Sequence, residues 1–236
     1  MRKKRLIFFD KDKEHIAEAI RILRTNLYFT ESKDRKVILI TSSIPKEGKS
    51  TVAANYAMSV AISGEKVILV DCDIRRPRVH DSFGINVDHG FEEVLLGRKE
   101  LEDVILENVE ENLDILPAKD NIKNITELFL GKKMADILTK LKEKYNLIVL
   151  DTPPLAVATD AALLSTYADG VVYVVGYNMV FKKELINGHK LLNKAGANIY
   201  GVVVNKVDKG GYALGNYGSY SSNYKYYNDY RNEPDK

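Results

Sequence analysis

Two kinds of hydrophobic pattern alternate along this chain. Short apolar runs rich in β-branched residues predict buried strands, and they occupy residues 37–42, 66–71, 147–151, 171–175 and 199–205. Longer stretches with apolar residues at helical spacing predict helices at residues 49–63, 131–144, 158–167 and 182–194. Strands that are hydrophobic on both faces are typical of covered parallel sheets. The pattern therefore predicts an α/β fold with a mostly parallel sheet and helices on both faces.

An amphipathic helix is predicted ahead of the first strand, at residues 12–29. Its apolar face is formed by Ile16, Ile20, Leu23 and Leu27. The charged residues Glu18, Arg21 and Arg24 are expected to lie mostly away from that face.

The pattern ends at Gly210, where glycine, serine, asparagine and tyrosine replace the aliphatic residues. Such a segment buries too little apolar surface to offset the entropy of ordering, so it predicts a disordered tail over 210–236 after a folded domain over 1–209. The tail holds half of the fourteen tyrosines: Tyr212, Tyr217, Tyr220, Tyr224, Tyr226, Tyr227 and Tyr230. A tyrosine platform for single-stranded nucleic acid is disfavoured because the tail is poor in arginine.

Composition narrows the class of protein further. The chain has 236 residues, 45% of them hydrophobic, which suits one large α/β domain with tails. A formal net charge of +2 with interspersed signs does not indicate nucleic-acid binding. The single cysteine, Cys72, leaves no internal disulfide, and the start of the chain does not resemble a secretory leader, so a cytosolic protein is expected. Apolar runs far shorter than about 20 residues suggest that any membrane contact is made through a partner.

Residues 43–50, SIPKEGKS, follow the first strand and precede a helix. They fit a P-loop in which Ser43 replaces the first glycine, and a chance loop before a helix is the alternative. In a P-loop, backbone N–H groups face phosphate oxygens, Lys49 reaches the β and γ phosphates, and the Ser50 hydroxyl binds Mg²⁺. The candidate nucleotide-binding residues here are Ser43, Pro45, Lys46, Glu47, Gly48, Lys49, Ser50 and Thr51.

Acidic residues end two further predicted strands. Asp151 follows LIVL and precedes two prolines, as a Walker B carboxylate that holds the Mg²⁺ shell would. Asp71 and Asp73 end the second strand and are followed by Arg75 and Arg76, which on their own could form a solvated turn with internal ion pairs. Beside a P-loop, the three acids are expected to converge on one metal-phosphate centre, because ligands bind at the carboxyl ends of parallel strands.

Residues 205–208, NKVD, match the NKxD pattern with which many GTPases recognise guanine. The two prolines after Asp151 stand where a GTPase has the glycine of its switch, so a GTPase is disfavoured. Asn205 is a candidate for contact with the base under either interpretation.

These motifs together resemble the bacterial tyrosine kinases that control capsule and exopolysaccharide synthesis, of the cytosolic type found in Gram-positive bacteria. The resemblance covers about residues 12–230 and rests on TSSIPKEGKST, ILVDCDIRRP, LIVLDTPP, the ExxRxxR motif of Glu18, Arg21 and Arg24, and the tyrosine cluster. Three features depart from the family pattern. Lys46 stands where glycine is common, Ile44 stands where partitioning ATPases carry a signature lysine, and 123–129 replaces a proline-rich segment.

The resemblance implies a P-loop NTPase fold and an ATP- and Mg²⁺-dependent protein-tyrosine autokinase that phosphorylates the tail between subunits. Lys49 and Ser50 would hold phosphates and metal, Asp73 and Asp151 would complete the Mg²⁺ shell, and Asp71 would accept the tyrosine proton. Asp71 and Asp73 could exchange these roles, and Arg75 and Arg76 would orient phosphate or substrate.

The resemblance also implies partners. These are further copies of the chain in a ring, an octamer in the family, joined through the ExxRxxR helix, and a transmembrane adaptor that recruits the protein to the inner face of the membrane and activates it. A phosphatase that resets the tail is expected as well. The alternative function is a P-loop ATPase switch of the chromosome-partitioning type without kinase activity.

Overall fold

A computed structural model describes residues 6–30, 36–119, 122 and 124–207. Its sheet has seven strands in the order β3-β4-β2-β5-β1-β6-β7. The strands are β1 (Val37–Ser42), β2 (Val67–Asp71), β3 (Leu106–Glu110), β4 (Leu113–Leu116), β5 (Leu147–Asp151), β6 (Gly170–Gly176) and β7 (Ile199–Asn205). Neighbouring strands are parallel except β3 and β4, which are antiparallel. The predicted mostly parallel sheet is confirmed.

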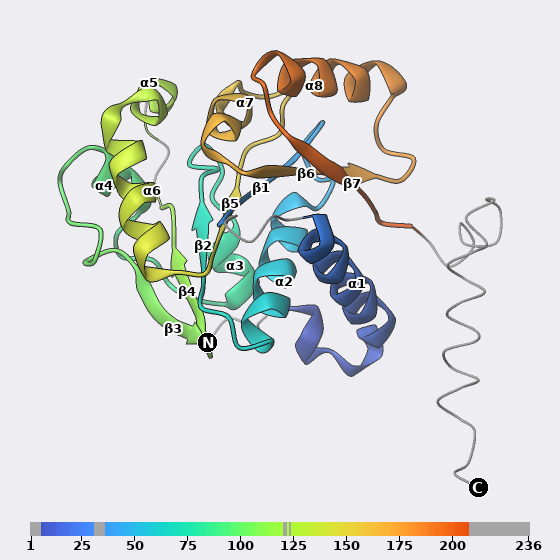
Figure 1. Cartoon of the computed structure of the whole chain (residues 1–236), viewed down its shortest axis with the longest axis horizontal. Helices are drawn as coiled ribbons and strands as arrows, with labels where there is room; N and C mark the ends of the chain where they lie inside the picture. The colour runs from blue at the N-terminus through green and yellow to red at the C-terminus, as the bar shows by residue number, and fades with distance from the viewer. Residues whose placement is uncertain (1–5, 31–35, 120–121, 123, 208–236) are drawn as a thin grey trace, which may run out of the picture.

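Helices cover both faces of the sheet (Figure 1). They are α1 (Glu14–Thr30), α2 (Lys49–Ile62), α3 (Val79–Phe83), α4 (Phe91–Leu95), α5 (Ile125–Leu130), α6 (Lys132–Lys144), α7 (Asp160–Leu164) and α8 (Lys182–Lys194). Short 3-10 turns, Ile7–Phe9 and Lys11–Lys13, precede α1, and a third, Ser165–Tyr167, continues α7.

Each face of the sheet has its own core. Val37 and Leu39 of β1 join a cluster with α4 to α8, whereas Ile38 and Ile40 join a cluster with α1, α2 and α3. Because successive strand residues point to opposite faces, a strand that is covered on both sides must be apolar throughout. This explains why the central strands were visible as continuous apolar runs.

The predicted strands and long helices are found within one to two residues of their expected ends, and 158–167 is divided between α7 and a 3-10 turn. The sequence pattern missed β3, β4, α3, α4 and α5. The three short helices have five or six residues, which is too few to establish a helical period. β3 is a partly exposed edge strand, LENVE, that carries acidic residues, so it lacks an apolar run.

Helix α1 packs on the sheet side that α2 covers. Of the predicted apolar face, Ile20 and Leu27 are buried and Ile16 and Leu23 are partly buried; Ala17 is buried as well. Arg21 is half-buried: it pairs with Glu18 (2.7 Å) and Glu14 (3.0 Å), and its guanidinium lies 5.7 Å from the centre of the Phe8 ring. Arg24 does not lie away from the packed face, because its Nη1 donates to the main-chain oxygen of Ser59 in α2 (2.6 Å).

Among the described residues, no helix combines the length and the apolar character needed to cross a membrane. The predicted domain boundary at 209/210, the tail and all seven of its tyrosines lie outside the described residues.

Candidate nucleotide-binding site

A cleft of about 520 Å³ lies where the carboxyl ends of β1 and β2 meet the start of α2. Both strands reach this edge because they run parallel to the same neighbour, β5. Nine of the predicted site residues line the cleft: Pro45, Lys46, Gly48, Lys49, Ser50, Thr51, Asp73, Arg75 and Arg76. Two motifs that lie far apart in the sequence therefore share one cavity.

The phosphate loop between β1 and α2 needs unusual backbone angles. Gly48, the N-cap of α2, has φ +98°, and a Cβ there would lie 2.1 Å from the side-chain nitrogen of Asn205. Only glycine fits both requirements. Lys46 also has a positive φ, +70°, at the position where the resembled family often carries glycine.

Lys49 is the centre of the site. Its exposed fraction is only 8%, and its Nζ lies 2.8 Å from Asp73 Oδ2, 3.3 Å from Asp151 Oδ1 and 3.1 Å from Ser50 Oγ. Burial opposes the charge of Lys49, but the attraction of Asp151 and Asp73 outweighs it and raises the pKa of the ammonium above its usual value. Lys49 therefore remains a cation among oxygen atoms.

The three acidic residues are not equivalent. Asp73 lines the cleft, whereas Asp71 and Asp151 have no exposed surface. Burial raises the pKa of Asp151, against the attraction of Lys49. Burial and the negative charge of Asp151 raise the pKa of Asp71 to about 8. The Asp71 carboxylate accepts from the main-chain N–H groups of Asp73, Arg78 and Val79, at 3.0–3.1 Å.

Arg75 is held by the protein itself. Its guanidinium donates to both carboxylate oxygens of Asp160, at 2.8 and 3.3 Å, and to the hydroxyl of Thr126. Asp160 is buried and also accepts from Thr126. Arg76 is exposed at the cleft, so of the two predicted arginines it is the better placed for a phosphate or an incoming substrate.

Asn205 and the neighbouring Lys206 lie against the phosphate loop. Asn205 Nδ2 donates to the main-chain oxygen of Glu47 (2.8 Å), and Lys206 Nζ donates to that of Lys46 (2.5 Å). Asp208, the last residue of the NKxD match, lies outside the described residues.

Two predicted loop residues turn away from the cleft. The Ser43 hydroxyl pairs with Tyr173 Oη (2.8 Å) in β6, and the Glu47 carboxylate is fully buried. Sequence reasoning missed Tyr173, Asp160 and Lys206. Lys206 could have been found as part of NKxD, but Tyr173 is hidden in the apolar run of its strand.

The oxygen atoms around Lys49 suit a Mg²⁺ ion. No group of three or more His, Cys, Asp or Glu side chains in the described part of the chain is arranged to hold a metal alone. Mg²⁺ usually binds one or two carboxylates together with phosphates and water, so such a group is not required. Ser50, Asp73 and Asp151 already surround the Lys49 ammonium, which shows that these oxygens favour a cation.

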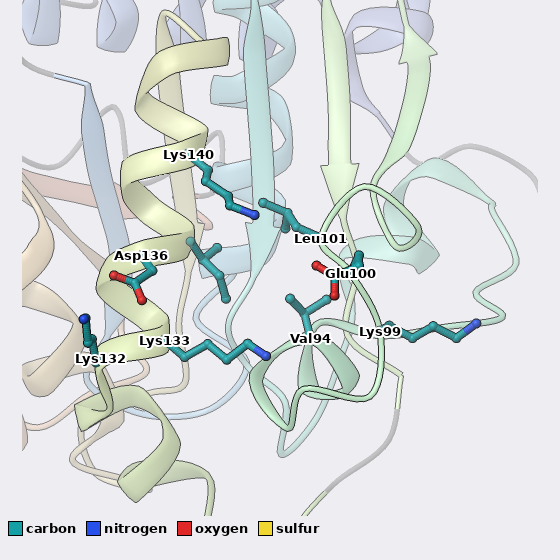
Figure 2. A pocket seen from close by; sticks show the side chains of 9 residues that line it. Val94, Lys99, Glu100, Leu101, Lys132, Lys133, Asp136 and Lys140 are labelled. Carbon is teal, nitrogen blue, oxygen red and sulfur yellow. The ribbon is translucent and has the colours of Figure 1, made fainter.

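A second pocket of about 430 Å³ lies between α6 and residues 94–101. Figure 2 shows Lys133 and Lys140 extending from α6 toward the segment that carries Val94 and Leu101. It contains none of the predicted site residues, so the cleft at the phosphate loop is the candidate nucleotide site.

The fold and the cleft together define a P-loop nucleotide-binding protein. A family profile described as an AAA domain matches residues 35–193. The archaeal cell-division ATPase MinD of Pyrococcus furiosus has a similar structure, with a TM-score of 0.62 and 25% identity over 72% of this chain and 71% of that one.

Comparisons with more similar proteins identify the family within this fold. The putative tyrosine-protein kinase CapB of Staphylococcus aureus is 34% identical over 86% of this chain and 89% of its own length. The tyrosine-protein kinase YwqD of Bacillus subtilis is 33% identical over 80% of each chain. A crystal structure of the chimerical protein CapA2B2 matches with a TM-score of 0.82 and 36% identity over 86% of this chain and 90% of that one. The chain belongs to the bacterial tyrosine kinase family.

Lys49→Met is expected to lower the affinity for ATP by at least about 30-fold, because loss of one partner of a buried charge pair costs about 2–5 kcal/mol. Isothermal titration with Mg-ATP measures the change. Lys140→Met, in the second pocket, is the control and should bind like the wild type. Equal affinity in both variants would contradict the site, provided that circular dichroism shows both to be folded.

Proposed function

We propose that this protein is an ATP- and Mg²⁺-dependent protein-tyrosine kinase that phosphorylates its own C-terminal tyrosines between subunits. The observation that carries the proposal is the buried Lys49 ammonium between Asp73 and Asp151, at the base of a cleft lined by the phosphate loop. Membership of the tyrosine kinase family supports the choice of tyrosine as the phosphate acceptor.

The cleft suits phosphoryl transfer because positive groups, among them Lys49 and Arg76, line the cavity in which the phosphates of ATP would bind. In the proposed complex the loop N–H groups and Lys49 bind the phosphates of ATP. Lys49 then leaves Asp73 and Asp151 for the β and γ phosphate oxygens. Arg76, exposed at the cleft, orients the γ phosphate or the incoming tyrosine.

Ser50, Asp73 and Asp151 would hold Mg²⁺, which when bound supplies positive charge to the β and γ phosphate oxygens. Departure of the Lys49 ammonium leaves two carboxylates facing one another, so a cation in its place removes their repulsion.

The reaction transfers one phosphoryl group. A tyrosine oxygen bonds to the γ phosphorus, the bond from that phosphorus to the β–γ bridging oxygen breaks, and ADP leaves with the electron pair. The hydroxyl proton passes to a carboxylate of the enzyme. Asp71 is the acid that makes no hydrogen bond to Lys49, and Asp73 is the acid that lines the cleft, so the two are the candidates for this role.

The C-terminal tyrosines can be delivered to a neighbouring copy. Lys206, four residues before the predicted tail, lines the cleft. Tyr212 follows Val207 by five residues, which span at most about 18 Å, whereas the 23 residues to Tyr230 span at most about 80 Å. The later tyrosines therefore have the longest reach toward the cleft of another subunit.

By family, we further propose that the kinase regulates capsular or exopolysaccharide synthesis, that it forms a ring, and that a transmembrane adaptor activates it at the inner face of the membrane. The chain spans 28% of the putative tyrosine-protein kinase EpsB of Ralstonia nicotianae, so longer relatives carry further segments that could supply such an adaptor.

The main alternative is an ATPase switch of the partitioning type, which shares the fold. Ile44 stands at the position of that class's signature lysine, which favours the kinase. A GTPase is disfavoured by Pro153 and Pro154 after Asp151. The appearance of phosphotyrosine separates the kinase from both.

Wild-type protein incubated with Mg-ATP and an adaptor segment should accumulate phosphotyrosine, measured by mass spectrometry. A tagged Lys49→Met chain should become phosphorylated only when wild type is added, because its tail must enter another subunit.

Asp73→Asn should raise the Mg²⁺ concentration for half-maximal activity. Asp71→Asn should leave that concentration unchanged and slow transfer by about 10²- to 10⁴-fold, as loss of a general base does. The reverse pattern would exchange the two roles, and ATP hydrolysis without phosphotyrosine would favour the switch.

Helix α1 is expected to mediate self-association through Glu18 and Arg21, which form a partly exposed i,i+3 pair. Replacing both with alanine should lower the mass measured by light scattering. The pair contributes only a few tenths of a kcal/mol to a helix, so the monomer should keep its melting temperature. Arg24→Ala is the contrasting variant, because it removes a contact with α2 and should lower that temperature. An unchanged mass in the double variant would show that Glu18 and Arg21 only stabilise the helix.

Full phosphorylation of the tail is expected to drive the assembly toward monomers. Each phosphotyrosine adds about −1.5 to −2 charges, so seven add about −10 to −14 to a chain of net charge +2. Tails gathered at neighbouring clefts would then repel, and a phosphatase would restore the assembly. Sedimentation of both forms at low and high salt tests this, because salt screens exposed charges beyond about 8 Å at physiological ionic strength. Equal masses in the two forms at low salt would exclude control of assembly by the tail.

A further inference from the structure

The carboxylate of Glu47 lies behind the phosphate loop. Its neighbours Lys46 and Gly48 line the cleft, whereas Glu47 does not and has no exposed surface. A carboxylate without solvent contact must be satisfied by donors of the protein.

Both Glu47 oxygens accept a main-chain hydrogen bond. Oε2 accepts from the Ile44 N–H (2.8 Å), which closes the loop on itself. Oε1 accepts from the Gly176 N–H (2.9 Å), which ties the loop to the end of β6. Hydrogen bonds to an ionised acceptor are about twice as strong as neutral ones, so Glu47 joins two segments that lie 129 residues apart.

Other hydrogen bonds also hold the phosphate loop against the ends of the strands. Asn205 and Lys206 at the end of β7 hold the main-chain oxygens of Glu47 and Lys46. Tyr177, which follows Gly176, donates its N–H to the main-chain oxygen of Asn205 (2.8 Å). The loop is thus attached to the ends of β6 and β7. The Glu47 carboxylate links it to the end of β6, and the Ser43–Tyr173 hydrogen bond links its first residue to the middle of that strand.

No other side chain can replace this carboxylate. The two donors require two acceptor atoms. Glutamine has the same shape, but it offers one oxygen and places an NH₂ group against the second donor. Aspartate keeps the charge but is shorter by one carbon–carbon bond, about 1.5 Å, so it cannot hold both N–H groups at these distances.

We propose that Glu47 is a positioning residue that presets the loop N–H groups for phosphate without touching the nucleotide. The proposal rests on the nucleotide site proposed above. A loop held in its binding shape before the ligand arrives loses less conformational entropy on binding. Because the restraint acts on the loop, it concerns the phosphates and not the base.

Glu47→Gln tests the proposal in the full-length protein. The matched control is Glu92→Gln in α4, because Glu92 is also buried (2% exposed) and accepts a main-chain N–H, that of Lys119 (3.3 Å), but does not line the cleft. Binding of Mg-ATP and of Mg-tripolyphosphate, which has no base, is measured by calorimetry, together with the KM for ATP and the melting temperature.

Glu47→Gln should lower the affinities for ATP and for tripolyphosphate by the same factor, about 10- to 100-fold, because loss of a hydrogen bond to a charged group has an effect of this size. The KM for ATP should rise with it. Glu92→Gln should lower the melting temperature but leave both affinities unchanged. Glu47→Asp, which keeps one of the two bonds, should fall between wild type and Glu47→Gln, and it carries the test if Glu47→Gln does not fold.

Wild-type affinity for tripolyphosphate in Glu47→Gln or in Glu47→Asp would overturn the proposal. So would equal losses of affinity in Glu47→Gln and Glu92→Gln, because a general loss of stability would then explain both. Loss of ATP binding alone would place Glu47 at the base and would also overturn it. If the wild type binds neither ligand, the nucleotide site itself is wrong.

Discussion

The buried ammonium of Lys49 is the interaction on which the rest of the site depends. A cation with 8% exposure is stable only when anions replace its water, and Asp73 and Asp151 do so at 2.8 and 3.3 Å. The parallel sheet makes this possible. Asp71 and Asp151 are register partners at the ends of β2 and β5, and β5 also pairs with β1, which leads into the phosphate loop. In the proposed complex, phosphate oxygens replace the carboxylates as partners of Lys49, and Mg²⁺ would take the place of the ammonium between Asp73 and Asp151.

The phosphate loop depends on strands that follow it by more than 120 residues. Gly176 at the end of β6 and Asn205 at the end of β7 are bonded to Glu47 across 129 and 158 residues. Lys206, the residue after β7, also contacts the loop, since its Nζ donates to the main-chain oxygen of Lys46.

Some charged residues of the motifs are already bound to other groups of the same chain. Arg75 is bound to Asp160 and Thr126 and connects the second motif to α7 and α5, while Arg24 is bound to α2. Neither guanidinium is available to a ligand or a second copy without breaking these contacts. This favours Arg76 as the arginine that acts at the cleft, whereas Arg21 on α1 is itself paired with Glu14 and Glu18 of its own helix.

The sequence by itself determined the central strands, the long helices, the phosphate loop and the family, because each is encoded by neighbouring residues. β1 could be recognised since burial on both faces demands an unbroken apolar run, and the loop since its residues follow one another between a strand and a helix. The sequence also predicted that Asp71, Asp73 and Asp151 come together beside the phosphate loop, because the ends of parallel strands share one edge.

Only the tertiary structure decided which way each polar side chain points. Glu47 sits in a phosphate-binding motif yet turns into the protein, and Arg75 turns to Asp160, because their partners lie 129 and 85 residues away. β3 and the short helices also depend on packing, since five polar or mixed residues have no periodicity of their own. Local patterns specify elements, whereas the direction of a side chain depends on the donors and acceptors that the fold brings to it.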